Sequence, residues 1–264
     1  MVKFNIGNFL AKIENRQKIL PHIEAAIVSN KWPESYQVEI DSSPYYGLTK
    51  PDGTKGVGGS GDGYFHPSTH PLMGNRRLWL EFHPEFCKKK LPQRRTLSGE
   101  MTLAMGTAIH AIVQEQMVMA GILKRENIEY EYVNEEHMCR GRIDAIATIP
   151  GEGDIPVEFK TQNSFSFKKQ DHIKESWDIQ LSMGMDNSGH DHGVLMVLES
   201  GWPYSMKEFQ VPRNDAKLSE VYEKFDSVRD DLALDIMPKP CCEPGSGIMQ
   251  ECPFRYVCWG EGSK

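Results

Sequence analysis

Two short apolar segments that carry charged residues, GRIDAIATI at 141–149 and GDIPVEFKTQ at 153–162, constrain this 264-residue chain more than any other feature. Their β-branched residues and partial alternation predict two β-strands, and the glycines and aspartate of residues 151–154 supply the turn between them. Strands joined by so short a turn pair as a hairpin, so the fold must contain a sheet at this point of the chain.

The charged residues of this hairpin fall on one face of the expected sheet. Side chains at positions i and i+2 of a strand point the same way, so Glu158 and Lys160 project together while Phe159 points to the opposite face. Hairpin pairing brings Asp144 beside them. Two carboxylates and an ammonium group on one patch suit a Mg²⁺ or Mn²⁺ ion that activates water and holds a phosphate. An ordinary ion pair on a solvated sheet face is the alternative.

The remaining patterns predict further strands and helices around this hairpin. A long helical segment is expected over residues 98–127, beginning at Ser98, and carries an apolar stripe of Met105, Ile109, Ile112 and Val113. Other helical patterns occupy residues 171–188, residues 219–237 as far as Pro238, and residues 9–29 with a break at Pro21; strands are expected at 128–149 and 193–200. This order predicts an α/β fold with a mixed sheet flanked by helices.

Composition excludes several classes of protein. An apolar fraction of 39% is too high for a disordered or fibrous chain. No apolar run approaches the roughly 18 residues of a membrane span, and the charged N-terminus is unlike a signal peptide, so a soluble cytoplasmic protein is expected. The net charge of −7 argues against a generally basic nucleic-acid-binding surface, although residues 88–95 are locally basic.

The six cysteines are unevenly distributed. Cys241, Cys242, Cys252 and Cys258 lie within the last 24 residues, whereas Cys87 and Cys139 stand alone. In a cytosolic protein such clustering favours a metal site over disulfides, and a local zinc site of the four late cysteines is one alternative. Cys139, in an apolar strand, is expected to be a buried thiol.

Four short motifs carry a family resemblance. GTAIH contains His110, GRIDAI contains Asp144, VEFKT contains Glu158 and Lys160, and DIQLSMGM contains Gln180. In this order they resemble the PD-(D/E)XK superfamily, in particular RecB-like exonucleases of the iron–sulfur type, such as CRISPR-associated RecB-type, AddB-type and phage exonucleases.

The resemblance implies a restriction-endonuclease-like core in residues 64–264, with residues 1–63 an extension of unknown role. It implies that His110, Asp144, Glu158 and the carbonyl of Phe159 bind the metal, that Lys160 serves catalysis together with Asp144 and Glu158, and that Gln180 contacts the substrate or the active site. The chain departs from the family at Gly184, where these relatives usually have a tyrosine.

The resemblance also implies a [4Fe–4S] cluster that staples the C-terminal segment to the core. The family uses one early and three late cysteines, the last two spaced as in CPFRYVC. Cys252 and Cys258 match that spacing, Cys242 is preferred over Cys241 as the third ligand, and Cys87 is the candidate early ligand. Zinc is the alternative metal.

The residues together with this resemblance thus predict a Mg²⁺- or Mn²⁺-dependent DNA exonuclease. The resemblance implies that it acts on single-stranded ends, in phage or mobile-element recombination or replication. If phage-encoded, it would act in the host cytoplasm, and the resemblance is compatible with a homo-oligomer or with recombination and replication partner proteins. The alternative is a DNA-binding or assembly module of a helicase–nuclease or integration complex. Three tryptophans, Trp79, Trp202 and Trp259, could stack on bases, but burial is the commoner role.

Overall fold

The computed structural model describes residues 17–29, 31–36, 62–91 and 96–260, which fall into two compact units. The first, called the sheet unit, contains the described residues before 41 together with Glu100–Tyr132 and Arg142–Asn214. The second, called the cysteine unit, contains the described residues between 41 and 99, Val133–Gly141, and the described residues from Asp215 onward.

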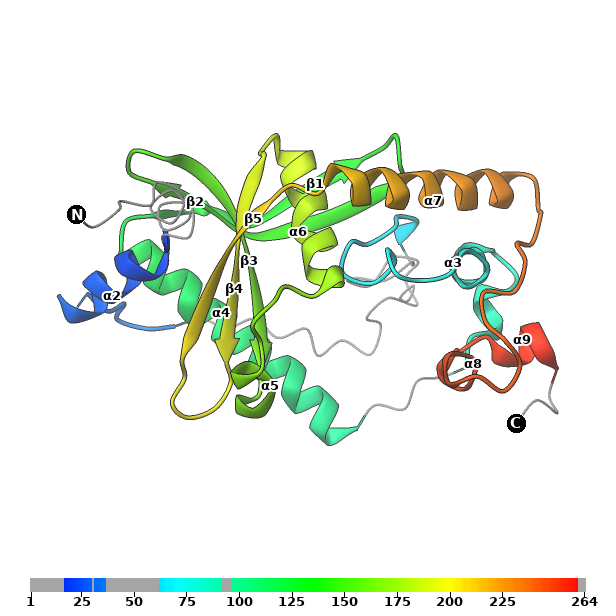
Figure 1. Cartoon of the computed structure of the whole chain (residues 1–264), viewed down its shortest axis with the longest axis horizontal. Coiled ribbons are helices and arrows are strands. Elements are labelled where there is room, and N and C mark those ends of the chain that lie inside the picture. The colour runs from blue at the N-terminus through cyan, green and yellow to red at the C-terminus, as the bar shows by residue number, and fades with distance from the viewer. Residues whose placement is uncertain (1–16, 30, 37–61, 92–95, 261–264) are drawn as a thin grey trace, which may run out of the picture. The chain divides into compact units, whose positions relative to one another are not determined.

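The described residues form a mixed five-stranded sheet in the order β1-β2-β3-β4-β5 (Figure 1). The strands are β1 (Leu123–Asn134), β2 (Cys139–Ile149), β3 (Gly153–Gln162), β4 (His192–Glu199) and β5 (Met206–Pro212). The pairs β2–β3 and β4–β5 are antiparallel, whereas β3–β4 is parallel. A parallel pair needs a crossover connection, which α5 (Ser164–Lys168) and α6 (Glu175–Ser188) provide.

Helices cover both faces of this sheet. On one face, strand residues pack with α2 (Leu20–Val28) and α4 (Leu97–Met119) in a cluster that includes Ile19, Ile23, Val113, Met117, Val157, Phe159, Val194 and Met196. On the other face, α5 and α6 contribute to a second cluster that includes Phe167, Leu181, Met185, Leu195, Val197 and Val211. Because Val157 and Phe159 face α4, the alternation of β3 turns Glu158 and Lys160 toward the α6 face.

Two carboxylates of the sheet unit hold the start of α2 and the residues before it, and one of them is that of Glu152, which pairs with Lys18 Nζ at 2.7 Å. Glu208 on β5 accepts backbone N–H groups from Lys18 (2.5 Å), Ile19 (3.0 Å) and Leu20 (3.0 Å). Pro21 stands in the first turn of α2, where a missing N–H is harmless, and residues 17–19 before it are not helical, so the predicted break at Pro21 is confirmed within the described residues. Residues 9–16 of the expected helix lie outside the described residues.

The cysteine unit is mainly helical. It contains α3 (Asn75–Phe82), the short 3-10 helix η2 (Cys87–Lys89), α7 (Asp215–Ala233), α8 (Gly247–Glu251) and α9 (Arg255–Trp259). Aromatic stacking holds its core, with the Phe65 and Phe225 ring centroids 4.3 Å apart and those of His137 and Tyr222 4.1 Å apart. Cys139 is fully buried in this unit, as the sequence predicts.

Most predicted elements are present, with four differences. The helix expected over residues 98–127 ends at Met119, and residues 123–127 belong to β1. Strand β5 was not predicted, because its mostly polar sequence gains its place only by pairing with β4. Helix α7 ends at Ala233, before Pro238. In the stripe on α4, Val113 is buried, but Met105 and Ile112 are 45% and 41% exposed, so only part of the predicted apolar face packs on the sheet. No helix in the described part of the chain has the length and apolar content to cross a bilayer.

Candidate active site

Glu158, Lys160 and Gln180 form a closed triangle of hydrogen bonds on the α6 face of the sheet. Lys160 Nζ donates to Glu158 Oε1 and to Gln180 Oε1, both at 2.7 Å, and Gln180 Nε2 donates to Glu158 Oε1 at 2.6 Å. The first two residues come from β3 and the third from α6. The sequence-predicted Glu–x–Lys pair and Gln180 are therefore in direct contact.

Asp144 lies where β2 and β3 begin to separate. The strands pair from Ile149 and Gly153 as far as Ala145 and Val157. Beyond this point the Phe159 N–H donates to the Asp144 carboxylate, at 2.7 Å from Oδ2. The predicted placement of Asp144 beside the Glu158 strand is confirmed, and its carboxylate is held in place by backbone.

His110 approaches the same carboxylate from α4. Its Nδ1 lies 3.9 Å from Asp144 Oδ2, and its ring centroid is 5.5 Å from that of Phe159. Burial lowers the pKa of His110, so the imidazole is neutral near pH 7 and keeps a lone pair for a metal ion. The structure thus brings His110, Asp144, Glu158 and Lys160 into one site.

Burial dominates the electrostatics of the two acids. It raises the pKa of Asp144 to about 7, and the nearby Glu129 carboxylate adds to the shift. It also raises the pKa of Glu158 to about 7, with a further contribution from Asp144. Burial opposes the charge on Lys160, but Glu158 and Asp144 together outweigh that effect and raise its pKa. The lysine is therefore an ammonium ion beside two carboxylates that need a cation.

Two polar residues that the sequence did not single out support this site. Gln114, one helical turn after His110, donates from Nε2 to the Asp144 carbonyl (2.8 Å) and to Glu129 Oε1 (3.2 Å). Glu129 on β1 has a left-handed φ of 53°, and Arg142 lies 3.5 Å from its Oε2. The i, i+4 spacing from His110 could have indicated Gln114, whereas only the packing of β1 reveals Glu129.

Close packing explains why a glycine stands at position 184. It is buried on α6, and a Cβ there would lie 3.0 Å from Ile143 Cγ1. The helix therefore lies close to β2 at this point, and a tyrosine side chain at 184 would displace it. The departure from the family pattern is consistent with this close approach.

The donor set of this site fits a hard divalent cation. It combines two desolvated carboxylates with a neutral imidazole, and the Phe159 carbonyl follows Glu158 directly in sequence. In this structure the positive charge beside the Glu158 carboxylate is the Lys160 ammonium group, 2.7 Å from Oε1. Among the described residues, no three His, Cys, Asp or Glu side chains form a group that could hold a metal ion as they stand.

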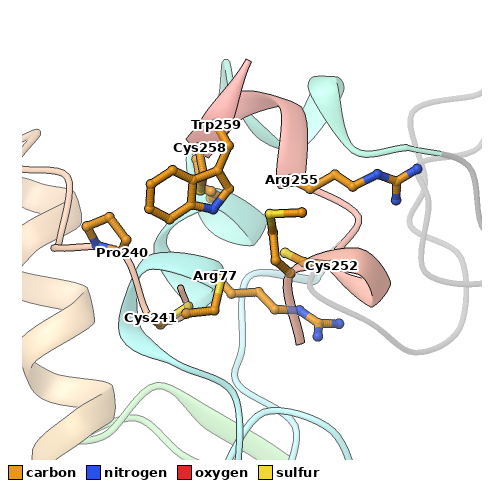
Figure 2. Close-up of a pocket in the computed structure, with 10 residues that line it drawn as sticks. Arg77, Pro240, Cys241, Cys252, Arg255, Cys258 and Trp259 are labelled. Carbon is orange, nitrogen blue, oxygen red and sulfur yellow. The ribbon is translucent and has the colours of Figure 1, made fainter. Parts of the chain in front are cut away.

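The four late cysteines line one cavity in the cysteine unit (Figure 2). Figure 2 shows Cys241 and Cys252 on different sides of it and Cys258 next to the indole of Trp259. Cys242 is also part of the lining. Burial raises the pKa of the Cys258 thiol, and the neighbouring cysteines add to the shift. The sequence cluster is therefore also a spatial cluster.

The Cys241 side chain packs directly against Gly74. A Cβ at Gly74, the residue before α3, would lie 2.3 Å from Cys241 Cβ and 2.8 Å from its Sγ. Cys87, by contrast, is not among the cavity-lining residues, and its thiol donates to the Pro84 carbonyl (3.6 Å). Any side chain at 74 would push Cys241 out of its place.

The basic run at 88–95 is only partly described. Lys90 Nζ bonds to the buried Glu81 carboxylate at 2.7 Å, and Lys89 lies over the Phe86 ring at 4.5 Å. These two lysines therefore have structural partners within the cysteine unit. Arg94 and Arg95 lie outside the described residues.

Comparison with known proteins finds solved structures that match this chain with low sequence identity and low TM-scores. No family model and no curated protein matches the chain. The structure of SSO0001 has 13% identity and a TM-score of 0.42, covering 93% of this chain and 98% of that chain. The alkaline exonuclease LHK-Exo from Laribacter hongkongensis has 13% identity and a TM-score of 0.45, covering 66% of this chain and 89% of that chain. Its complex with dAMP covers the same shares, with 14% identity and a TM-score of 0.49. At these values the matches do not establish a shared family or activity.

Proposed function

We propose that this protein is a divalent-metal-dependent deoxyribonuclease that acts as an exonuclease on single-stranded DNA ends. The observation that carries the proposal is the joining of Lys160, Glu158 and Gln180 beside the buried Asp144 carboxylate. The motif order described above, with its PD-(D/E)XK resemblance, supports the same conclusion. An ordinary surface ion pair would not bury two acids and raise both of their pKa values.

His110, Asp144, Glu158 and the Phe159 carbonyl would hold Mg²⁺ or Mn²⁺. When bound, the ion lowers the pKa of water and polarises the phosphate. The role of Lys160 follows from its protonation. Because its pKa is raised, it serves as a donor that stabilises negative charge on the phosphate oxygens during displacement and does not act as the general base.

Gln180 acts through this lysine. Its carbonyl accepts from Lys160 and its amide donates to Glu158, so it orients both groups toward the α6 face. Removing it should leave the charges in place but loosen their geometry. Gln180→Ala should therefore lower the rate of cleavage less than Lys160→Ala does.

Cleavage of end-labelled single-stranded DNA with Mn²⁺ tests the proposal. The wild type should degrade the strand from an end, Lys160→Ala should reduce the rate by about a hundred-fold or more, and the exposed Lys124→Ala should leave it unchanged. EDTA should stop the reaction. If the wild type binds DNA but cuts no faster than Lys160→Ala, the assembly-module alternative replaces the enzyme. A phage or mobile-element role and partner proteins stay predictions.

We further propose that Cys241, Cys242, Cys252 and Cys258 hold a [4Fe–4S] cluster. Their shared cavity supports this set, because each iron of the cluster takes one thiolate and the four ligands surround a volume. Zinc would instead require four sulfurs around a single ion, with Zn–S distances of about 2.3 Å. The sequence-derived set differs by including Cys87 and omitting Cys241.

Metal analysis of single Cys→Ser variants separates these sets. Anaerobically purified wild type should be brown and contain iron and acid-labile sulfide. Cys241→Ser should lower the iron content, whereas Cys87→Ser should retain it. The opposite result would restore the sequence-derived set, and a colourless protein with stoichiometric zinc would overturn the iron–sulfur proposal.

A further inference from the structure

Three large aromatic side chains are exposed on two neighbouring segments of the sheet unit. Phe165 on α5 is 71% exposed, and Trp202 and Tyr204, in the turn between β4 and β5, are 83% and 62% exposed. Together they are called the aromatic patch. Of the two roles left open for the tryptophans, burial holds for Trp79, which is 1% exposed, and does not hold for Trp202. Exposed aromatic rings in one place mark a binding surface more often than isolated exposed residues do.

The two segments are held together by hydrogen bonds. The Ser200 N–H and hydroxyl both donate to the Gln162 carbonyl at the end of β3, at 2.8 and 3.1 Å. Ser164 Oγ donates to the Trp202 carbonyl at 3.4 Å. Figure 1 shows α5 and the β4–β5 turn at the same end of the sheet. The patch is therefore positioned by the sheet.

Positive charge accompanies the aromatic patch. Lys169 Nζ lies 3.9 Å from the Phe165 ring centroid, and the preceding Lys168 is exposed. The nearby Glu199 is 3% exposed and its Oε2 accepts from the Ser205 N–H, so this carboxylate is withdrawn from the surface. Asp171, the exposed acid of this region, is hydrogen-bonded to its neighbour His172. Lysines beside free ring faces suit a ligand that combines flat rings with negative charge.

The aromatic patch lies just after the end of β3, the strand that carries Glu158 and Lys160 of the candidate active site. At about 3.3 Å per residue, β3 advances about 7 Å from Lys160 to its end at Gln162. Phe165 lies three residues further along the chain. A nucleic-acid strand with one phosphate at Lys160 can therefore reach the patch within a few nucleotides.

We propose that Phe165, Trp202 and Tyr204 stack on bases of the single-stranded substrate, with Lys168 and Lys169 contacting its phosphates. This inference rests on the proposed nuclease function for the identity of the ligand. Aromatic side chains stack on any base, so the surface binds without sequence preference. Paired bases in a duplex present no free faces, so the patch selects single strands.

Binding of fluorescein-labelled (dT)₁₂ in EDTA, followed by anisotropy, tests the patch without cleavage. Trp202→Ala should raise the Kd about ten-fold or more, as expected for the loss of a base–aromatic stack, whereas Trp202→Phe should retain most of the affinity. Trp32→Ala, which removes another exposed tryptophan of the sheet unit, should bind like the wild type. Lys169→Ala should weaken binding and make it less dependent on salt.

Two comparisons keep this test separate from that of the nuclease function. In EDTA, where nothing is cut, the wild type should still bind (dT)₁₂, and binding of a blunt duplex should be unaffected by Trp202→Ala. If Trp202→Ala and Tyr204→Ala both bind (dT)₁₂ with wild-type affinity, or if duplex binding falls equally, the stacking surface is refuted. A patch used for a protein partner would give the first of these results. Unchanged thermal midpoints of the exposed-site variants confirm that they are folded.

Discussion

Replacing Asp144 with Asn should make the metal-free protein more stable at pH 8. In the wild type this carboxylate is desolvated and faces the charge of Glu129, so its ionised form is disfavoured in the folded state. Asn keeps a side-chain oxygen that can accept the Phe159 N–H, as the Asp144 carboxylate does now at 2.7 Å. The substitution thus removes the charge and keeps the hydrogen bond.

The magnitude follows from the pKa shift. The pKa of Asp144 rises from an ordinary 3.8 to about 7 on folding. At about 1.4 kcal/mol per unit, the full effect on the free energy of unfolding is about 4 kcal/mol. The side chain keeps 15% of its surface exposed, and water reduces the penalty, so we expect about half of that value, ~2 kcal/mol.

The pH dependence has a definite sign. The folded state binds the proton of Asp144 more tightly than the unfolded state does, so wild-type stability falls as pH rises from about 4 to about 7 and is level above. The advantage of Asp144→Asn should therefore be largest at pH 8 and much smaller at pH 5. Saturating Mn²⁺ should stabilise the wild type and not the variant.

Urea unfolding in EDTA at pH 5 and pH 8, followed by circular dichroism, measures this difference. Asp154→Asn is the matched control, because Asp154 is exposed at the other end of the same hairpin, where it accepts from Thr148. The control should show no gain at pH 8. If Asp144→Asn is less stable than the wild type at pH 8 without metal, buried charge is not what limits the stability of this site.

Three further substitutions test the packing of the two units. Glu208→Ala removes the acceptor of three backbone N–H groups before α2, and should lower the free energy of unfolding by about 2 kcal/mol in urea titration; an unchanged midpoint would show that the segment contributes little. Gly184→Tyr should destabilise the protein by about 1–3 kcal/mol and lower its melting temperature, because α6 lies against β2 there; a wild-type melting temperature would contradict this close packing. Gly74→Ala should displace Cys241 and lower the bound iron, whereas Gly247→Ala, where a Cβ meets nothing within 4 Å, should retain it; equal iron contents would remove Gly74 from the argument.

The hairpin was predictable because its signals are local. Alternation along β3 determines that Glu158 and Lys160 share a face, and the short turn determines that Asp144 lies on the adjacent strand. The joining of Gln180 to this pair was indicated by motif order and family resemblance alone. Its hydrogen bonds depend on how α6 packs across the sheet, which no spacing within the helix specifies.

Burial was less predictable than secondary structure. A helical stripe indicates which residues share a face, but only the positions of α4 that meet the sheet, such as Ile109 and Val113, are covered, whereas Met105 and Ile112 are exposed. Trp202 has a large apolar side chain of the kind usually buried, but it lies in the turn between β4 and β5 and is 83% exposed. In both cases the neighbours that decide burial are distant in sequence.

By itself, the sequence determined strands β1 to β4, the turn between β2 and β3, the placement of Asp144, Glu158 and Lys160 together, and the grouping of the late cysteines. These follow from the period of a strand and from short chain separations. Only the tertiary structure decided that Lys160 remains charged, that Cys241 fills the space left by Gly74, and that three aromatic rings are exposed after β3. Desolvation, close approach and exposure are set by residues that the chain brings together from far apart.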